Sequence, residues 1–155
     1  MTLKGEWQVD STNPPIDPIE NGFTFKVDDT NGDNVFYRVL PGGAAATNSD
    51  PGWTSNRTKT RWTFKDKTGV IAAGITKVII RDRSSKAPSL FSIKVVGKNG
   101  DFHVDTALVP VSVTVILGDH DQGSAGQCTA LPFNADGGPS PSCKVSGGGS
   151  VVNCR

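Results

Sequence analysis

The most regular stretch of this chain is Val109-Pro110-Val111-Ser112-Val113-Thr114-Val115-Ile116-Leu117, which carries a valine or leucine at every second position. Successive side chains of a β-strand point to opposite faces of a sheet, so a period of two residues predicts a strand with one face in the core. The same pattern recurs in residues 60–65 and 89–96, whereas residues 75–81 carry Val78, Ile79 and Ile80 consecutively, which predicts a strand covered in part on both faces. No segment has a helical moment of note. The core is therefore expected to be built from strands.

A hairpin is predicted before these strands. Residues 23–27 and 35–40 are apolar, alternating segments on either side of Asn31-Gly32, a dipeptide typical of tight hairpin turns. Residues 41–52 form a polar loop that ends at Trp53, and a further strand is expected at residues 127–131.

A second hairpin is predicted at the end of the chain. Residues 143–146 and 151–154 flank the turn Gly147-Gly148-Gly149-Ser150. Symmetry about that turn places Cys143 opposite Cys154 and Val145 opposite Val152.

These short strands, with turn residues at intervals of about 8–12 positions, predict an all-β, antiparallel β-sandwich of about 8–10 strands. Immunoglobulin-like and jelly-roll-like arrangements both fit the pattern. A length of 155 residues suits one domain. We expect residues 21–155 to form the sandwich, with the cysteine-bearing hairpin 143–154 at its end.

Residues 1–20 are expected to form an extended, proline-rich N-terminal arm, because the prolines of residues 13–18 favour extended or turn structure. An extended arm of this length spans roughly 60 Å, enough to lie along the open sheet edge of a neighbouring subunit. This predicts a homo-oligomer or polymer formed by strand addition. The alternative is that the arm packs on its own domain or frays.

The composition narrows the class of protein. Lys and Arg total 16 against 15 Asp and Glu, with the signs interspersed, so the balance implies no polyanionic partner and no nucleic acid. No run of 18 apolar residues predicts a membrane span. The first residues lack the apolar segment of a signal peptide, but three cysteines lie in the Gly-, Ser- and Pro-rich sequence after residue 127. We therefore expect a mature segment of an exported protein, located outside the cell or on its surface.

Residues 58–155 resemble an uncharacterised, cysteine-containing β module of predicted secreted or surface proteins of environmental bacteria. The resemblance is carried by residues 62–67, 74–80, 95–100 and 111–117, and by the cysteine segments Gly126-Gln127-Cys128, Ser142-Cys143-Lys144 and Asn153-Cys154. It implies β architecture and export, and it implies no catalytic residue.

The cysteines Cys128, Cys143 and Cys154 are candidates for a disulfide. Three thiols allow three single bridges, and the sequence does not choose among them. A bridge between Cys143 and Cys154 would join opposed hairpin positions, whereas either one with Cys128 would tie the hairpin to the preceding strand. Buried free thiols are the main alternative.

Two acidic segments are candidate metal sites, and the first of them suggests calcium. Asp29, Asn31 and Asp33 occupy the first, third and fifth places of an EF-type loop, but Asn34 and Leu40 stand where that loop requires Gly and Glu. A hairpin turn explains the same residues.

The second segment is Asp119-His120-Asp121, which follows a predicted strand. Its three side chains converge on one ion only if the loop curls, so a solvated loop is the alternative. No other cofactor is predicted.

No catalytic signature is present, and Ser124 with His120 is only a sequence proximity, so we predict a protein that is not an enzyme. Trp7, Trp53 and Tyr37 lie near turns or edges, where exposed aromatic rings could form a sugar-binding platform. Burial in the core is the alternative for these aromatic side chains. The expected function is structural, adhesive or self-assembling, with carbohydrate binding second and metal-assisted hydrolysis third.

Overall fold

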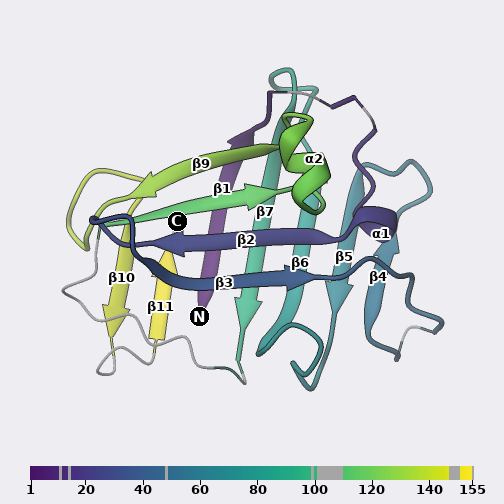
Figure 1. Cartoon of the computed structure of the whole chain (residues 1–155), viewed down its shortest axis with the longest axis horizontal. Coiled ribbons are helices and arrows are strands. Elements are labelled where there is room, and N and C mark those ends of the chain that lie inside the picture. Colours follow the sequence, from purple (N-terminus) through teal and green to yellow (C-terminus); the bar gives the residue numbers. More distant parts are fainter. Residues whose placement is uncertain are drawn as a thin grey trace.

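The computed structural model describes residues 1–10, 12–13, 15–47, 49–98, 100, 110–146 and 151–154. Within them the chain forms eleven strands and two short helices (Figure 1). In chain order these are β1 (Thr2–Gln8), α1 (Pro18–Asn21), β2 (Phe23–Asp28), β3 (Asn34–Leu40), β4 (Gly52–Ser55), β5 (Arg61–Lys65), β6 (Ile75–Asp82), β7 (Leu90–Gly97), β8 (Val111–Ile116), α2 (His120–Ser124), β9 (Cys128–Phe133), β10 (Cys143–Ser146) and β11 (Val151–Cys154).

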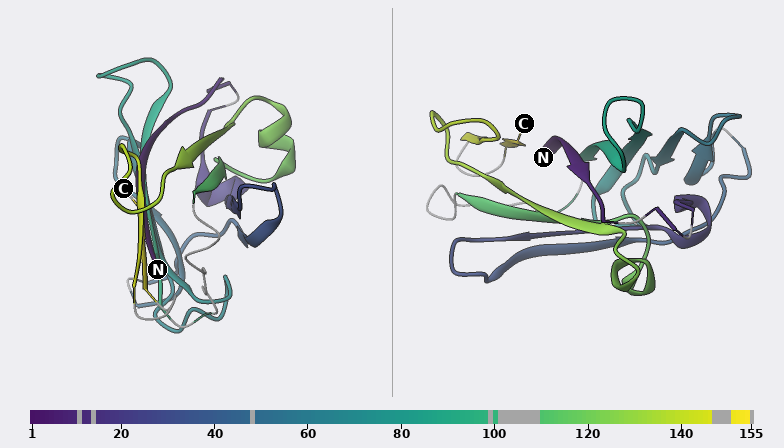
Figure 2. Two further views of the ribbon diagram at one scale, coloured as in Figure 1. Left: turned by 90° about the vertical axis from the view of Figure 1, so that its left-hand side faces the viewer. Right: turned by 90° about the horizontal axis from the view of Figure 1, so that it is seen from above.

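The strands form two sheets, and the predicted all-β sandwich is confirmed. A seven-stranded sheet has the order β10-β11-β1-β7-β6-β5-β4, and a four-stranded sheet has the order β3-β2-β8-β9. Figure 1 shows the four-stranded sheet running across the strands of the larger one, and Figure 2 shows the two as separate layers. Neighbouring strands are antiparallel except β1 and β11, which are parallel.

The larger sheet contains a meander of four consecutive strands, β4 to β7. An immunoglobulin sandwich divides its strands as ABED and CFG, and a jelly roll has eight strands in two Greek keys. The seven-plus-four division of this chain follows neither arrangement.

The core lies between the sheets and is built by the predicted alternation. In β7, Phe91, Ile93 and Val95 are buried, while the side chains between them are partly exposed. The Trp7 and Phe133 rings lie 6.3 Å apart between centroids and connect β1 of one sheet to β9 of the other.

Both predicted hairpins are confirmed. In the first, Phe23 pairs with Leu40 and Asp28 with Asn34, so the loop is longer than the Asn31-Gly32 dipeptide alone. In the second, β10 and β11 pair with Cys143 opposite Cys154. Val145 pairs with Val152, as symmetry predicted, and the turn at residues 147–150 lies outside the described residues.

The prediction that residues 1–20 form a separate arm was wrong for residues 2–8. Residues 2–8 are extended, but they form β1, which pairs with β7 on one side and β11 on the other. Leu3 and Trp7 are buried, with Gly5 between them. The missing side chain at Gly5 interrupts the apolar alternation and hid this strand from sequence analysis.

Three other elements were missed. The loop predicted to end at Trp53 contains β4, a strand of four residues. Pro18 begins α1, where Asp17 accepts a hydrogen bond from the Ile19 N–H at 3.1 Å; proline is well suited to the first turn of a helix. The third is α2, which follows β8.

Candidate functional site

The proposed aromatic platform is not formed. Trp7 and Trp53 are 2% and 0% exposed, because both point from the larger sheet into the core. The Trp53 indole N–H donates to the Pro41 carbonyl at 3.0 Å and its ring packs against Phe64. Tyr37 is exposed, but it lies on β3 of the other sheet.

The Asp29 carboxylate is used within its own hairpin loop. Its Oδ1 accepts hydrogen bonds from the N–H groups of Asn31 at 2.8 Å and Asp33 at 3.0 Å. Gly32 has a φ of 84°, the left-handed conformation that glycine adopts readily.

The Asp119-His120-Asp121 segment stands at the start of α2, with Asp119 capping the helix, whereas both sequence interpretations expected a loop. The Asp119 carboxylate accepts from the Asp121 N–H at 2.8 Å, and the Gln122 side chain accepts from the Asp119 N–H at 3.1 Å, which forms a capping box. Ser124 ends the same helix. Among the described residues, no group of three or more His, Cys, Asp and Glu side chains is placed to hold a metal ion.

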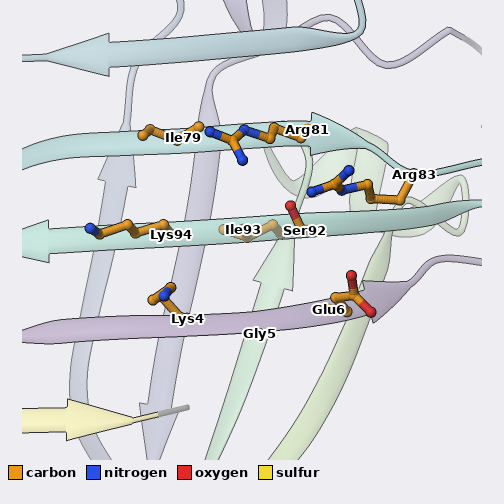
Figure 3. A pocket seen from close by; sticks show the side chains of 9 residues that line it. All are labelled: Lys4, Gly5, Glu6, Ile79, Arg81, Arg83, Ser92, Ile93 and Lys94. Carbon is orange, nitrogen blue, oxygen red and sulfur yellow. The ribbon is translucent and has the colours of Figure 1, made fainter.

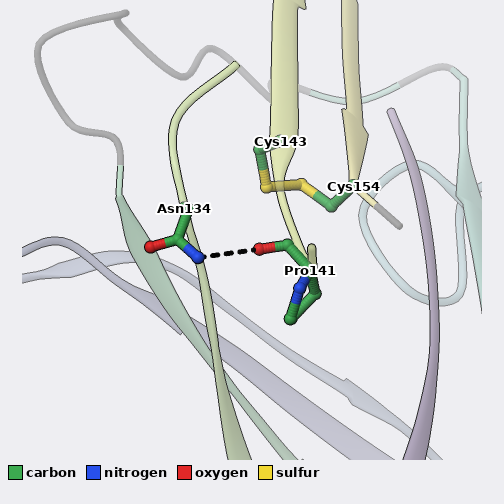
Figure 4. Close-up of a disulfide and its surroundings, with 4 residues drawn as sticks. All are labelled: Asn134, Pro141, Cys143 and Cys154. Atoms are coloured by element: carbon green, nitrogen blue, oxygen red, sulfur yellow. Dashed lines mark hydrogen bonds between the residues drawn. A yellow bond between two sulfur atoms is a disulfide. The ribbon is translucent and has the colours of Figure 1, made fainter. Parts of the chain in front are cut away.

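The structure joins Cys143 and Cys154 in a disulfide and leaves Cys128 as a free, partly buried thiol (Figure 4). Next to this bridge, the Asn134 side chain donates to the Pro141 carbonyl at 3.3 Å, and the Cys143 N–H donates to the Asn134 carbonyl at 2.7 Å. These contacts cover part of the outer edge of β10.

The most distinctive surface is the outward face of the larger sheet, which sequence analysis did not predict. Trp62, Phe64, Val78 and Ile80 point inward from β5 and β6, so the residues between them point outward. Across β1, β5, β6 and β7, and at Arg83 just after β6, these outward residues include seven cations. We call this surface the cationic face: Lys4, Arg61, Lys65, Lys77, Arg81, Arg83 and Lys94.

The cations are placed directly opposite one another. Lys4 pairs with Lys94 across β1 and β7, and Arg61 pairs with Arg81 across β5 and β6. Lys65 pairs with Lys77 across the same two strands. Like charges at directly opposed positions destabilise a sheet, so three such pairs on one face carry an energetic cost.

Acidic side chains do little to offset this charge. Glu6 is the only carboxylate among the outward residues of the four strands β1, β5, β6 and β7. It forms an ion pair with Lys86, whose Nζ lies 3.2 Å from the Glu6 Oε1. In the part of the chain that the structure describes, none of the seven cations has an acidic partner within ion-pair distance.

A hollow of about 580 Å³ lies on this face, over β1, β7 and β6. Figure 3 looks onto it: Arg81 and Arg83 lie beside Ser92, and Lys94 lies beside Lys4. The Arg83 Nε is buried and has no hydrogen-bond partner among the described residues. Its cations therefore offer hydrogen-bond donors to an anion, while Glu6 is the one carboxylate among the residues that line it.

The sequence contained part of this pattern. Arg61 and Lys65 stand four positions apart in one strand, as do Lys77 and Arg81 in another, so each pair points to one side of its strand. Only the strand order brings these pairs together, and a net charge of +1 conceals them.

Comparison of the chain with protein-family models, with curated proteins and with solved structures gives no match. No helix in the described part of the chain is long and apolar enough to cross a membrane.

Proposed function

We propose that this chain is a non-enzymatic, exported adhesive module that binds an anionic polymer through the cationic face. The observation that carries the proposal is the set of three directly opposed cation pairs, Lys4 with Lys94, Arg61 with Arg81 and Lys65 with Lys77. The three pairs lie in three successive rows across the sheet, so the negative charges of a polymer crossing any one row offset the repulsion within the pair of that row. Part of the binding free energy therefore comes from reducing the electrostatic repulsion between opposed cations in the free protein.

Export is supported by the disulfide between Cys143 and Cys154, because such bonds persist in oxidising compartments. An adhesive role is supported by the shape of the surface. The cationic face extends over four neighbouring strands, which suits an extended polymer better than a small molecule.

The test is binding of fluorescently labelled polyglutamate, a polymer that offers carboxylates and little else. We expect binding at low salt that weakens steeply as salt is added, because exposed charges are screened within about 10 Å at 0.1 M. The double variant Arg81→Ala, Lys94→Ala should lose most of this binding. Lys26→Ala, Lys59→Ala makes the same change of charge at two lysines outside the face, which pair with Asp28 and Asp17, and should retain it. Equal binding by both double variants, or none by the wild type, contradicts the proposal.

Self-association is a second candidate function, favoured by the edge strand β3. Tyr37 and Val39 on this strand are 52% and 45% exposed. Long edge strands with exposed apolar residues are sites of strand addition. The predicted route through residues 1–20 would require β1 to leave both of its partners, whereas β3 pairs only with β2 in the described sheet.

For this second function, light scattering should show dimers that increase with concentration, and Val39→Lys should shift the equilibrium toward monomer. Deletion of residues 1–8 should instead impair folding. A monomer at all concentrations up to the millimolar range contradicts self-association without affecting the adhesive proposal.

A further inference from the structure

We infer that the polymer bound by the cationic face is a linear acidic polysaccharide that carries carboxylates on its sugars. This inference rests on the proposed function and specifies its partner. Four features of the cationic face point to this partner: the spacing of the cations, the geometry of the arginines, the hydroxyl groups beside the cations, and the absence of aromatic rings from the outward positions of β1, β5, β6 and β7.

The spacing of the sheet suits a polysaccharide chain that crosses the strands. Neighbouring strands lie roughly 4.8 Å apart, close to the advance of a pyranose chain per sugar. Lys4 and Lys94 are neighbours in this direction, as are Arg61 and Arg81. A polysaccharide lying across β1, β7, β6 and β5 thus meets one strand per sugar.

The arginines provide a stronger contact at one point of this path. Arg81 and Arg83 both line the hollow of about 580 Å³, a volume within the usual range of small-ligand sites, about 300–1,000 Å³. A guanidinium group binds a carboxylate through two parallel hydrogen bonds, which fixes direction as well as charge.

Hydroxyl groups stand between the cations. Ser92 lies opposite both Glu6 and Arg81, and Thr63 lies opposite Ile79 in the row that contains Lys94. Ser92 is part of the hollow and only partly buried. Its hydroxyl can donate to or accept from a sugar hydroxyl, a contact that a simple polyacid does not offer.

Other polyanions fit this face less well. Single-stranded nucleic acids gain affinity by stacking bases on aromatic side chains, and the outward residues of β1, β5, β6 and β7 include no aromatic side chain. The large apolar residues at these positions are Ile79, Leu90 and Val96, and all three are partly buried within the sheet. The face therefore has no apolar side chain suited to insertion into a lipid bilayer.

The experiment compares four labelled ligands at equal concentration of negative charge: polygalacturonate, polyglutamate, duplex DNA and phosphatidylglycerol vesicles. Polygalacturonate should bind about tenfold more tightly than polyglutamate, which corresponds to about two hydrogen bonds to sugar hydroxyls. Polygalacturonate with its carboxylates reduced to alcohols should not bind.

The variant Ser92→Ala separates sugar recognition from charge. It should weaken polygalacturonate binding about threefold to tenfold, the effect of one hydrogen bond, and leave polyglutamate binding unchanged. Thr54→Ala, an outward hydroxyl on β4 beyond the hollow, is the matched control and should change neither. Melting temperatures of both variants should equal that of the wild type.

The two proposals fail in different ways. If DNA or vesicles bind as tightly as polygalacturonate, or if Ser92→Ala affects both polyacids equally, the polysaccharide inference is overturned and the adhesive function stands. If none of the four ligands binds at low salt, both proposals fall.

Discussion

Gly5 determines how β1 packs, because it leaves room for a neighbouring ring. A Cβ atom built at position 5 would lie 2.5 Å from Cη2 of Trp7, so the indole ring of Trp7 folds back over the glycine. In this position the Trp7 ring still packs against Phe133 of the other sheet, with 6.3 Å between the ring centroids. A glycine that weakens a strand in isolation thus supports the core here.

Gly5→Ala should therefore destabilise the protein by about 1–3 kcal/mol through overpacking, although alanine is the better residue for an ordinary strand. Gly123→Ala in α2 is the control, because the added methyl group would make only ordinary contacts with Ile116. Urea unfolding followed by tryptophan fluorescence measures both. Equal stability of Gly5→Ala and the wild type would show that the ring moves without cost.

Asp66 is a buried carboxylate that organises the loop between β5 and β6. It is 1% exposed, and it accepts hydrogen bonds from the Thr68 hydroxyl at 2.6 Å and from the Ile71 N–H at 2.9 Å. Burial by itself would raise the pKa of Asp66, but the hydrogen bonds from Thr68, Ile71 and Gly69 together hold this pKa below its ordinary value. The charged form is therefore favoured in the folded protein.

This pKa has a defined effect on stability. Because it is lowered on folding, the stabilisation is complete above the ordinary aspartate value of about 3.9 and is lost as the pH falls through the folded pKa. Asp66→Asn should cost about 1–3 kcal/mol at pH 7, since an amide N–H would face the donor of Ile71. The loss should shrink as the pH approaches 3. A loss that stays constant between pH 7 and pH 3 contradicts this account; Asp136→Asn, at an exposed position, is the control.

At the scale of strands, the opposed cations of the cationic face predict a conflict between stability and binding. Lys65→Glu places a carboxylate opposite Lys77, so it should stabilise the fold by about 0.2–1 kcal/mol. The same variant should bind polyanions more weakly. Arg57→Glu makes the same charge change in the exposed turn between β4 and β5 and should not stabilise the fold. Thermal unfolding at low salt measures the first effect, and a Lys65→Glu variant less stable than wild type would show that the pair does not repel.

The disulfide should stabilise the hairpin at one end of the larger sheet. Cys143 and Cys154 are 11 positions apart, and in the chain-entropy model a loop of this size contributes about 3 kcal/mol. The double variant Cys143→Ser, Cys154→Ser should lose this amount in urea unfolding. A reductant should lower the stability of the wild type to the same level and leave that of the double variant unchanged. An unchanged wild type under full reduction would contradict a stabilising role.

Hairpins were predictable from the sequence because both strands and their turn lie in one continuous segment. The register that places Cys143 opposite Cys154 follows from symmetry about a local turn. The β2–β3 hairpin follows from two alternating segments. Pairings between distant segments were not predictable. The neighbours of β1 lie some 90 and 150 positions along the chain, so nothing local identified it as a sheet strand.

At the scale of the whole molecule, one continuous core joins the two sheets. The buried apolar residues form a single cluster with members from both layers. We therefore expect one cooperative unfolding transition, with circular dichroism of the strands and fluorescence of the buried tryptophans changing together. An earlier transition seen by one probe alone would indicate that one sheet unfolds independently.

The cationic face also depends on the arrangement of the whole molecule. The alternation of β5 and β7 is visible in the sequence, but the surface exists only because β5, β6, β7 and β1 lie side by side. Trp7 and Trp53 illustrate the opposite case. Their positions near predicted turns suggested exposure, whereas the stacking of two sheets buries both.

The position of β1 between β7 and β11 constrains the order in which the chain acquires its structure during translation. Residues 2–8 are synthesised well before their partners, because Leu90–Val96 follows some 90 positions later and Asn153-Cys154 some 150 positions later. Until then, Leu3 and Trp7 remain without a sheet to join. A nascent chain of this protein should therefore engage holding chaperones through residues 2–8, and its larger sheet should close only after Asn153-Cys154 has been synthesised.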